Sequence, residues 1–128
     1  MTTKTLLIVD DEKSILTALK RALADGDFRI LTAGSGQAAL DLIQSQEIHV
    51  ILTDNRMPEM SGIELLTKIR TTSPGTVRIM MTGYADLSTA MEAINSGEIF
   101  KFIVKPWDNA ELLQIICQAM TRFPNQKD

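Results

Sequence analysis

Short apolar runs alternate along this chain with longer segments in which apolar residues return every three or four positions. The short runs hold mostly branched and aromatic residues and predict strands, whereas the spacing in the longer segments predicts helices. The predicted strands cover residues 5–9, 28–32, 50–52, 77–81 and 100–104. A helix is predicted after each strand, so the chain consists of five strand–helix units in succession.

Turn and capping residues limit the predicted helices. Gly26 and Gly97 are placed to end the first and fourth helices, and Pro124 stops the last one. Asp108 and Glu111 have the spacing of a capping box at the start of that last helix. Because the strands are continuously apolar, both faces of each strand are expected to be buried under helices. The sequence therefore predicts a doubly wound α/β domain with a parallel sheet.

The composition is that of an ordinary soluble globular domain. The 128 residues are 45% hydrophobic and 23% charged, with a formal net charge of -3. The chain lacks the excess of basic residues that would indicate nucleic-acid binding. No apolar run reaches the roughly 18 residues needed to cross a membrane. The single Cys117 cannot form an internal disulfide, so the cytoplasm is the expected location. We expect one domain over 1–123, followed by a polar C-terminal tail, or the start of a linker, over 124–128.

Polar and charged residues gather where the predicted strands end. Asp10 and Asp11 follow the first strand, and Asp54 ends the third. Thr82 follows the fourth strand, and Lys105 follows the fifth. Because ligands of parallel α/β sheets bind outside the carboxyl ends of the strands, we expect these five side chains to face one crevice.

The residue types at these strand ends indicate metal-assisted phosphoryl chemistry. Asp10, Asp11 and Asp54 would repel one another unless a hard cation such as magnesium neutralised them. Asp54 projects from a buried strand and is the expected nucleophile, Lys105 supplies a compact positive charge, and Thr82 can donate to phosphate oxygens. A simpler interpretation is that the acidic residues after the first strand only stabilise the start of the first helix through its dipole.

The same residues belong to a pattern that resembles the receiver domains of two-component response regulators. The resemblance covers nearly the whole chain, from Leu6 to about Met120. The matching segments are Leu7-Ile8-Val9-Asp10-Asp11-Glu12, Leu52-Thr53-Asp54 with Met57-Pro58 and Gly62, Met81-Thr82-Gly83, and Phe102-Ile103-Val104-Lys105-Pro106. The resemblance implies a flavodoxin-like fold with strand order 2-1-3-4-5. It also implies a regulatory domain that is not an enzyme beyond its self-catalysed phosphorylation and autodephosphorylation.

The resemblance implies a role for each residue of the site. Asp54 would accept the phosphoryl group and also bind Mg2+, which Mn2+ could replace. Asp11 would be a direct metal ligand, Asp10 a metal-site carboxylate acting partly through water, and the backbone carbonyl of Arg56 a further ligand.

By the same resemblance, the domain is a switch. Lys105 would contact the phosphoryl group, and the Lys105–Pro106 bond is expected to be cis. The Thr82 hydroxyl would move toward the phosphoryl group while the Phe102 ring rotates inward. This movement would change the surface of the fourth helix, fifth strand and fifth helix.

The resemblance also implies the kinds of partner. A histidine kinase or a histidine phosphotransfer protein would supply the phosphoryl group. The switched surface would contact an output domain, an effector protein or a second copy of the domain. Neither nucleic acid nor a membrane is expected as a direct partner.

Two side chains near the predicted site are expected to affect the lifetime of the phosphoryl group. Arg56 lies two residues after Asp54, and Tyr84 lies two residues after Thr82. Both are expected to shield the group from water and slow autodephosphorylation. The segments Gly83-Tyr84-Ala85-Asp86, Gly97-Glu98-Ile99-Phe100 and Trp107-Asp108 are similar to receivers fused to HD-type cyclic-dinucleotide phosphodiesterases or linked to kinases.

Three other functions stay open at this point. A haloacid-dehalogenase-like phosphatase also uses a strand-end aspartate and magnesium, but it needs a second acid where this chain has Arg56. A flavodoxin-like cofactor binder needs a Gly/Ser/Thr-rich phosphate loop where this chain has Asp10-Asp11-Glu12. A degenerate receiver that serves only as an interaction module would not need all five site residues.

Two further residues are interpreted as structural. His49 has no second histidine for a metal site or a phosphorelay, and it is predicted to lie in the loop before the third strand. Cys117 lies among apolar residues of the last helix and is predicted to be a small, partly buried hydrophobic residue.

Overall fold

The computed structural model describes residues 3–124 and contains one parallel sheet with the strand order β2-β1-β3-β4-β5. The strands are β1 (Thr5–Val9), β2 (Arg29–Ala33), β3 (Val50–Asp54), β4 (Val77–Thr82) and β5 (Lys101–Val104). The helices are α1 (Lys13–Ala22), α2 (Gly36–Ser45), α3 (Gly62–Thr72), α4 (Leu87–Asn95) and α5 (Asn109–Thr121), with a short 3-10 helix, η1 (Tyr84–Asp86), before α4. The predicted doubly wound sheet and its strand order are confirmed.

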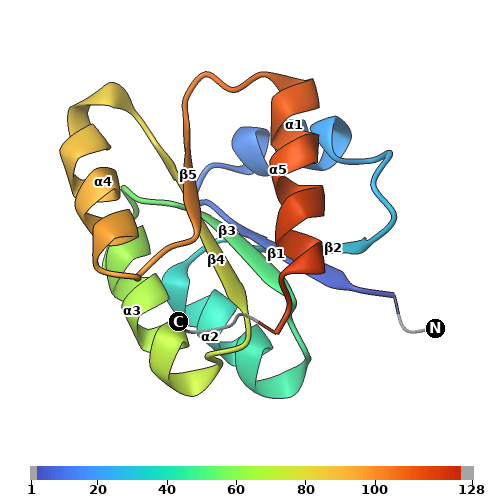
Figure 1. The fold of residues 1–128 in the computed structure, drawn as a ribbon, viewed down its shortest axis with the longest axis horizontal. Coiled ribbons are helices and arrows are strands. Elements are labelled where there is room, and N and C mark those ends of the chain that lie inside the picture. The colour runs from blue at the N-terminus through green and yellow to red at the C-terminus, as the bar shows by residue number, and fades with distance from the viewer. Residues whose placement is uncertain (1–2, 125–128) are drawn as a thin grey trace.

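Helices cover both faces of the sheet (Figure 1). Helices α1 and α5 pack on one face, against side chains that include Leu6 and Ile8 of β1. Helices α2, α3 and α4 pack on the other face, against side chains that include Leu7 and Val9. Successive side chains of a strand point to opposite faces, so the unbroken apolar run of β1 fills both layers of the core. This burial fixes the register of β1 and therefore the position of the aspartates that follow it.

Several element boundaries differ from those expected. Strand β2 begins one residue later than predicted, and Phe28 instead lies before it and packs against the edge of the core. Strand β5 begins at Lys101 instead of Phe100, and η1 was not expected. No helix among residues 3–124 is long and apolar enough to span a membrane. The predicted C-terminal tail lies, from residue 125 onward, outside the described residues.

The interpretation of Cys117 was wrong, because its side chain is exposed. Helix α5 buries the stripe formed by Leu112, Ile116 and Ala119, and the residue after Ile116 falls outside that stripe. Apolar neighbours in sequence therefore did not place the thiol in the core, since helical rotation turns each next residue by about 100°.

His49 lies in the loop before β3, as predicted, and its ring is buried at the N-terminal edge of the sheet. Its Nδ1 accepts a hydrogen bond of 3.0 Å from the backbone N–H of Thr5, and its ring centroid lies 4.3 Å from that of Phe123. Its Nε2 lies 3.5 Å from Glu47. Burial lowers the pKa of His49, Glu47 raises it and Lys4 lowers it, with a net decrease. The folded protein therefore favours a neutral ring whose Nδ1 is free to accept.

The stability of the protein is expected to fall as the pH drops below the ordinary histidine pKa of about 6.5. Because the pKa of His49 is lower in the folded state, the unfolded chain takes up the proton first, and the loss continues until the pH passes the folded value. An Asn side chain can accept the same bond without titrating. Between pH 8 and pH 5, His49→Asn should lose about 1 kcal/mol less stability than the wild type in urea unfolding. If the wild type and His49→Asn lose the same stability over this pH range, His49 is not held neutral in the folded state.

Candidate functional site

The parallel register brings the ends of β1, β3, β4 and β5 to one edge of the sheet. Val9 pairs with Thr53, Asp54 pairs with Met81, and Thr82 pairs with Val104. The ladder continues by one residue after β5, because the backbone N–H of Lys105 donates to the carbonyl of Thr82 at 2.8 Å. The residues predicted from the strand ends are thus placed on neighbouring strands.

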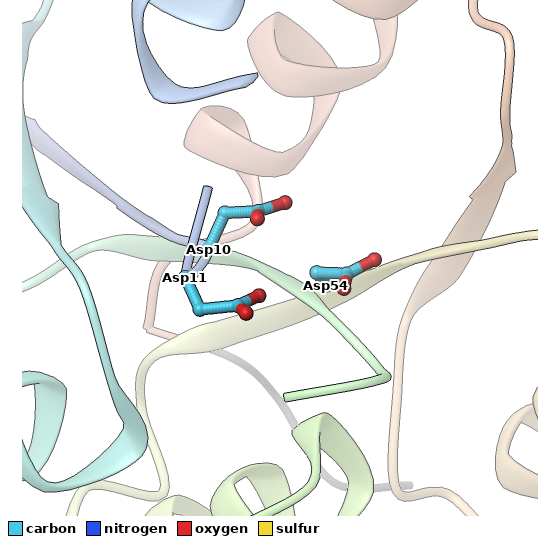
Figure 2. Close-up of side chains that lie close together, drawn as sticks. All are labelled: Asp10, Asp11 and Asp54. Carbon is cyan, nitrogen blue, oxygen red and sulfur yellow. The ribbon is translucent and has the colours of Figure 1, made fainter. Parts of the chain in front are cut away.

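Three carboxylates gather at this edge. One oxygen from each of Asp10, Asp11 and Asp54 lies within 4.8 Å of the other two (Figure 2). Asp10 is 1% exposed, Asp11 is exposed, and Asp54 lies between them in burial. The cluster is therefore buried at Asp10 and open to solvent at Asp11, so an ion could enter it from the solvent.

Lys105 supplies the positive charge of the site. Its Nζ lies 2.7 Å from Oδ1 of Asp54 and 3.8 Å from Oδ2 of Asp10. Burial lowers the pKa of Lys105, but the hydrogen bond to Asp54 and the nearby carboxylates outweigh that effect and raise it overall. The ammonium group stays charged at neutral pH and is held against one carboxylate oxygen of Asp54.

The single positive charge of Lys105 does not neutralise the three carboxylates, and the surroundings of Asp10 show this. Oδ1 of Asp10 accepts a hydrogen bond of 2.9 Å from the backbone N–H of Glu12, whereas its buried Oδ2 has no hydrogen-bond partner among the described residues. Burial raises the pKa of Asp10, and repulsion from Asp54 and Asp11 adds to this, against the lowering by Glu12 and Lys105. A buried carboxylate oxygen without a donor is well suited to coordinate a divalent cation, and an all-oxygen donor set suits Mg2+.

Asp10→Asn is expected to raise the free energy of unfolding by about 1–2 kcal/mol at pH 7 in EDTA. The amide keeps the acceptor for Glu12 and removes a buried charge that lies beside Asp54. Because folding raises the pKa of Asp10, its carboxylate destabilises the fold increasingly as the pH rises through the ordinary aspartate range. The variant's advantage should therefore shrink toward pH 3, where both states of the wild type are protonated. Equal stabilities at pH 7 would show that the charge is already compensated.

The loop between β3 and α3 is held by Asn55, which the sequence analysis did not single out. Its carbonyl accepts from the N–H of Gly62 at 2.8 Å, and its Oδ1 accepts from the N–H of Ile63 at 3.1 Å. Glu59 in the same loop has a φ of 69°, in the left-handed region. These contacts close the loop so that the start of α3 lies against Asp54.

Of the two residues of the predicted switch, Thr82 lies at this edge and Phe102 lies two residues before the end of the neighbouring strand β5. Thr82 is 1% exposed, and its hydroxyl donates to the carbonyl of Gly83 at 3.2 Å. Phe102 is half-buried and packs with the core layer under α2, α3 and α4. The Lys105–Pro106 bond is cis, as predicted.

Arg56 is held by a residue that the sequence analysis did not single out as a partner. Its Nε and one terminal nitrogen donate to the two carboxylate oxygens of Asp86, at 2.7 and 3.1 Å. Tyr84 is 76% exposed. The predicted shielding of a phosphoryl group by Arg56 and Tyr84 stays a prediction. The sequence did place Asp86 close to this edge, because it follows Thr82 at the end of β4, the strand beside β3.

Comparisons with known proteins agree with the fold. The family model described as "Response regulator receiver domain" matches residues 6–117. The hydrogenase transcriptional regulatory protein HoxA of Cupriavidus necator is 40% identical over 116 residues, which make up 91% of this chain and 24% of that protein. The chain spans about a quarter of the length of the curated relatives it matches.

Solved structures give the same result. The structure of adenylate cyclase from Rhodopirellula baltica is 40% identical with a TM-score of 0.89, and the match covers 94% of this chain and 90% of that one. The signal receiver domain of an HD domain-containing protein from Pseudomonas fluorescens Pf-5 is 34% identical with a TM-score of 0.88, over 95% and 90% of the two chains. The chain belongs to the family of response regulator receiver domains.

Proposed function

We propose that Asp54 of this receiver domain accepts a phosphoryl group in a reaction that requires Mg2+. The observation that carries the proposal is the contact of 2.7 Å between Lys105 Nζ and Asp54 Oδ1, made beside two further carboxylates within 4.8 Å of Asp54. A carboxylate that faces both a fixed ammonium group and a cation site is placed to attack phosphorus, because phosphoryl transfer depends mainly on position and charge neutralisation.

Four groups would hold the metal. They are the carboxylates of Asp10, Asp11 and Asp54 and the backbone carbonyl of Arg56, and Mn2+ could serve in place of Mg2+. The bound ion would neutralise negative charge on the transferred oxygens. Oδ2 of Asp10 supports this proposal, because it is buried and accepts no hydrogen bond among the described residues, with only Lys105 Nζ at 3.8 Å, and burial of such an oxygen is unfavourable.

The chain's own residues would perform the transfer as follows. An oxygen of Asp54 forms a bond to phosphorus while the bond from phosphorus to a nitrogen of the donor imidazole breaks, and that nitrogen keeps the electron pair. Lys105 Nζ lies beside the carboxylate oxygen Oδ1 of Asp54 and would stabilise negative charge on the phosphoryl group. The Thr82 hydroxyl, which now donates to Gly83, would turn to donate to a phosphoryl oxygen.

The output of the switch would follow from the movement of Thr82. We propose that departure of its hydroxyl from Gly83 would let the half-buried ring of Phe102 turn inward, which would change the surface formed by α4, β5 and α5. We propose that this surface contacts an output domain, an effector or a second copy. We propose a histidine kinase or histidine phosphotransfer protein as the donor, and the cytoplasm as the location.

The proposal also separates this domain from an enzyme of the haloacid-dehalogenase type. Such an enzyme needs a second acid two residues after its nucleophile, and that position holds Arg56, whose side chain pairs with Asp86. We therefore propose a regulatory domain with no catalytic activity beyond its own phosphorylation and dephosphorylation. The domain boundary at residue 123 likewise stays a prediction.

Beryllofluoride, which imitates a phosphoryl group on a carboxylate, tests the proposal directly. With Mg2+ present, it should shift the backbone amide NMR signals of Asp54, Thr82 and Lys105, and the shifts should be absent without Mg2+. Asp54→Asn should abolish the response while it keeps the fold, which circular dichroism can check. As a control, Asp41→Asn removes an exposed carboxylate of α2 and should respond as the wild type does. No response of the wild type would overturn the proposal.

A further inference from the structure

Arg56 and Asp86 form a two-pronged ion pair at the phosphorylation edge. Two nitrogens of Arg56 donate to the two oxygens of Asp86, so the guanidinium and the carboxylate lie fork to fork. The Arg56 side chain is 73% exposed, whereas that of Asp86 is 18% exposed. Asp86 is thus the more fixed member, and the orientation of Arg56 is set by its partner.

The ion pair joins two segments that both border the site. Arg56 belongs to the loop that follows Asp54, the last residue of β3. Asp86 ends η1, which follows β4 and leads directly into α4. Charge links the pair to the acceptor as well, because Asp54 adds to the increase in the pKa of Arg56 that Asp86 mainly causes. A change of charge at Asp54 therefore changes the electrostatic potential at the guanidinium of Arg56.

Asp86 also occupies an unused capping position. It directly precedes α4, where an aspartate side chain commonly accepts a hydrogen bond from the first turn of the helix. Here its side chain caps nothing, and its backbone, with φ -109° and ψ 15°, is not in the extended conformation of the caps of α2, α3 and α5. The carboxylate is held toward the loop after β3 instead, mainly by Arg56 and with a smaller contribution from Asn55, and both lower its pKa.

From these contacts we infer that Asp86 is a positioning residue that competes with the phosphoryl group on Asp54 for Arg56. This inference rests on the proposed function. A phosphoryl group on Asp54 would bring roughly two negative charges and three strong acceptors to this edge, where the charge of Asp54 already acts on the guanidinium. When Arg56 turns to it, Asp86 loses this ion pair, and the segment that leads into α4 is no longer tied to the loop after β3 by Arg56. The ion pair is then a latch between the phosphorylation loop and the helix whose surface changes in the switch.

Competition makes a prediction that a purely structural ion pair does not. Asp86→Asn removes the competitor and should tighten binding of beryllofluoride in the presence of Mg2+ by about two- to fivefold, the range of an exposed ion pair. The effect requires Arg56, so Asp86→Asn in an Arg56→Ala background should leave the affinity unchanged. Asp86→Glu keeps a carboxylate and should bind more nearly as the wild type does. Affinities can be measured by titration of amide NMR signals.

The Nε–H signal of Arg56 gives a second readout. It should move when beryllofluoride binds to the wild type, and in unliganded Asp86→Asn it should already differ from that of the unliganded wild type. Glu92→Gln, which removes an exposed carboxylate from α4, controls for the loss of one negative charge and should not tighten binding. If the wild type binds beryllofluoride but Asp86→Asn binds no more tightly, the latch is wrong and the proposed function stands. If the wild type shows no Asp54-dependent binding, the proposed function itself fails.

Discussion

Replacement of Lys105 by methionine is expected to slow phosphorylation of Asp54 by a small phosphodonor about 100- to 1000-fold. The Nζ of Lys105 lies 2.7 Å from Asp54 Oδ1, so it is in place before charge develops on the transferred group. A donor fixed in this way needs no reorganisation during the reaction, which is why loss of one such group has effects of this size. Methionine keeps the length of the side chain and removes the charge. The rate can be followed as accumulation of phosphorylated protein with acetyl phosphate and Mg2+.

The same variant should bind Mg2+ more tightly than the wild type. Lys105 is the cation that now partly balances Asp10 and Asp54, and without it the carboxylates repel one another more strongly and attract a divalent cation more. A slower reaction despite tighter metal binding would show that Lys105 acts on the phosphoryl group and not through the metal. Lys101→Met, at the opposite end of β5, is the matched control and should change neither property. An unchanged rate in Lys105→Met would contradict the role assigned to it.

The site could be predicted largely because it lies on strand ends. Apolar runs locate buried strands, burial on both faces fixes the register, and the carboxyl ends of parallel strands meet at one edge. Each of three site residues follows or ends such a run: Asp10, Asp54 and Lys105. They were therefore expected to lie together, and Lys105 Nζ does lie within 3.8 Å of both carboxylates. The same reasoning located the five strands to within one residue at each N-terminal end.

The residues that the sequence did not reveal act through contacts between loops. Nothing in the local pattern pairs Arg56 with Asp86, which lies 30 residues later, because loop conformation decides that contact. Asn55 has the same property, since its partners belong to the first turn of α3.

Arg78 is a further case, because it stands within an otherwise apolar strand and is 4% exposed. Its guanidinium donates to the carbonyls of Thr76, Gly97 and Glu98, at 3.3, 3.2 and 2.7 Å. Burial lowers the pKa of Arg78 and repulsion from Arg70 adds to this, whereas Glu98 opposes it. Hydropathy alone gives a charged residue no buried role, so only the fold shows that Arg78 holds the turn before β5.

Gly62→Ala is expected to lower the free energy of unfolding by about 3 kcal/mol. A Cβ added at Gly62 would lie 2.3 Å from the carbonyl oxygen of Asp54 and 2.8 Å from Cα of Asn55. Both neighbours are backbone atoms, which cannot turn aside as a flexible side chain can. The variant must therefore move the start of α3 away from β3 or displace the backbone of Asp54 and Asn55. Urea unfolding monitored by circular dichroism would measure the loss.

The substitution at Gly62 should also damage the site beyond its effect on stability. Displacement of the Asp54–Asn55 backbone shifts the acceptor carboxylate relative to Lys105 and moves the carbonyl of Arg56, so affinity for beryllofluoride with Mg2+ should fall at least about tenfold in the protein that remains folded. Gly34→Ala is the matched control, because a Cβ there meets nothing within 4 Å, and it should change stability by no more than about 0.5 kcal/mol. If Gly62→Ala is as stable as Gly34→Ala and binds beryllofluoride normally, close packing of α3 against Asp54 does not position the acceptor. If it is unstable and the remaining folded protein binds weakly, the glycine is required because the helix must touch the backbone of Asp54, the proposed acceptor.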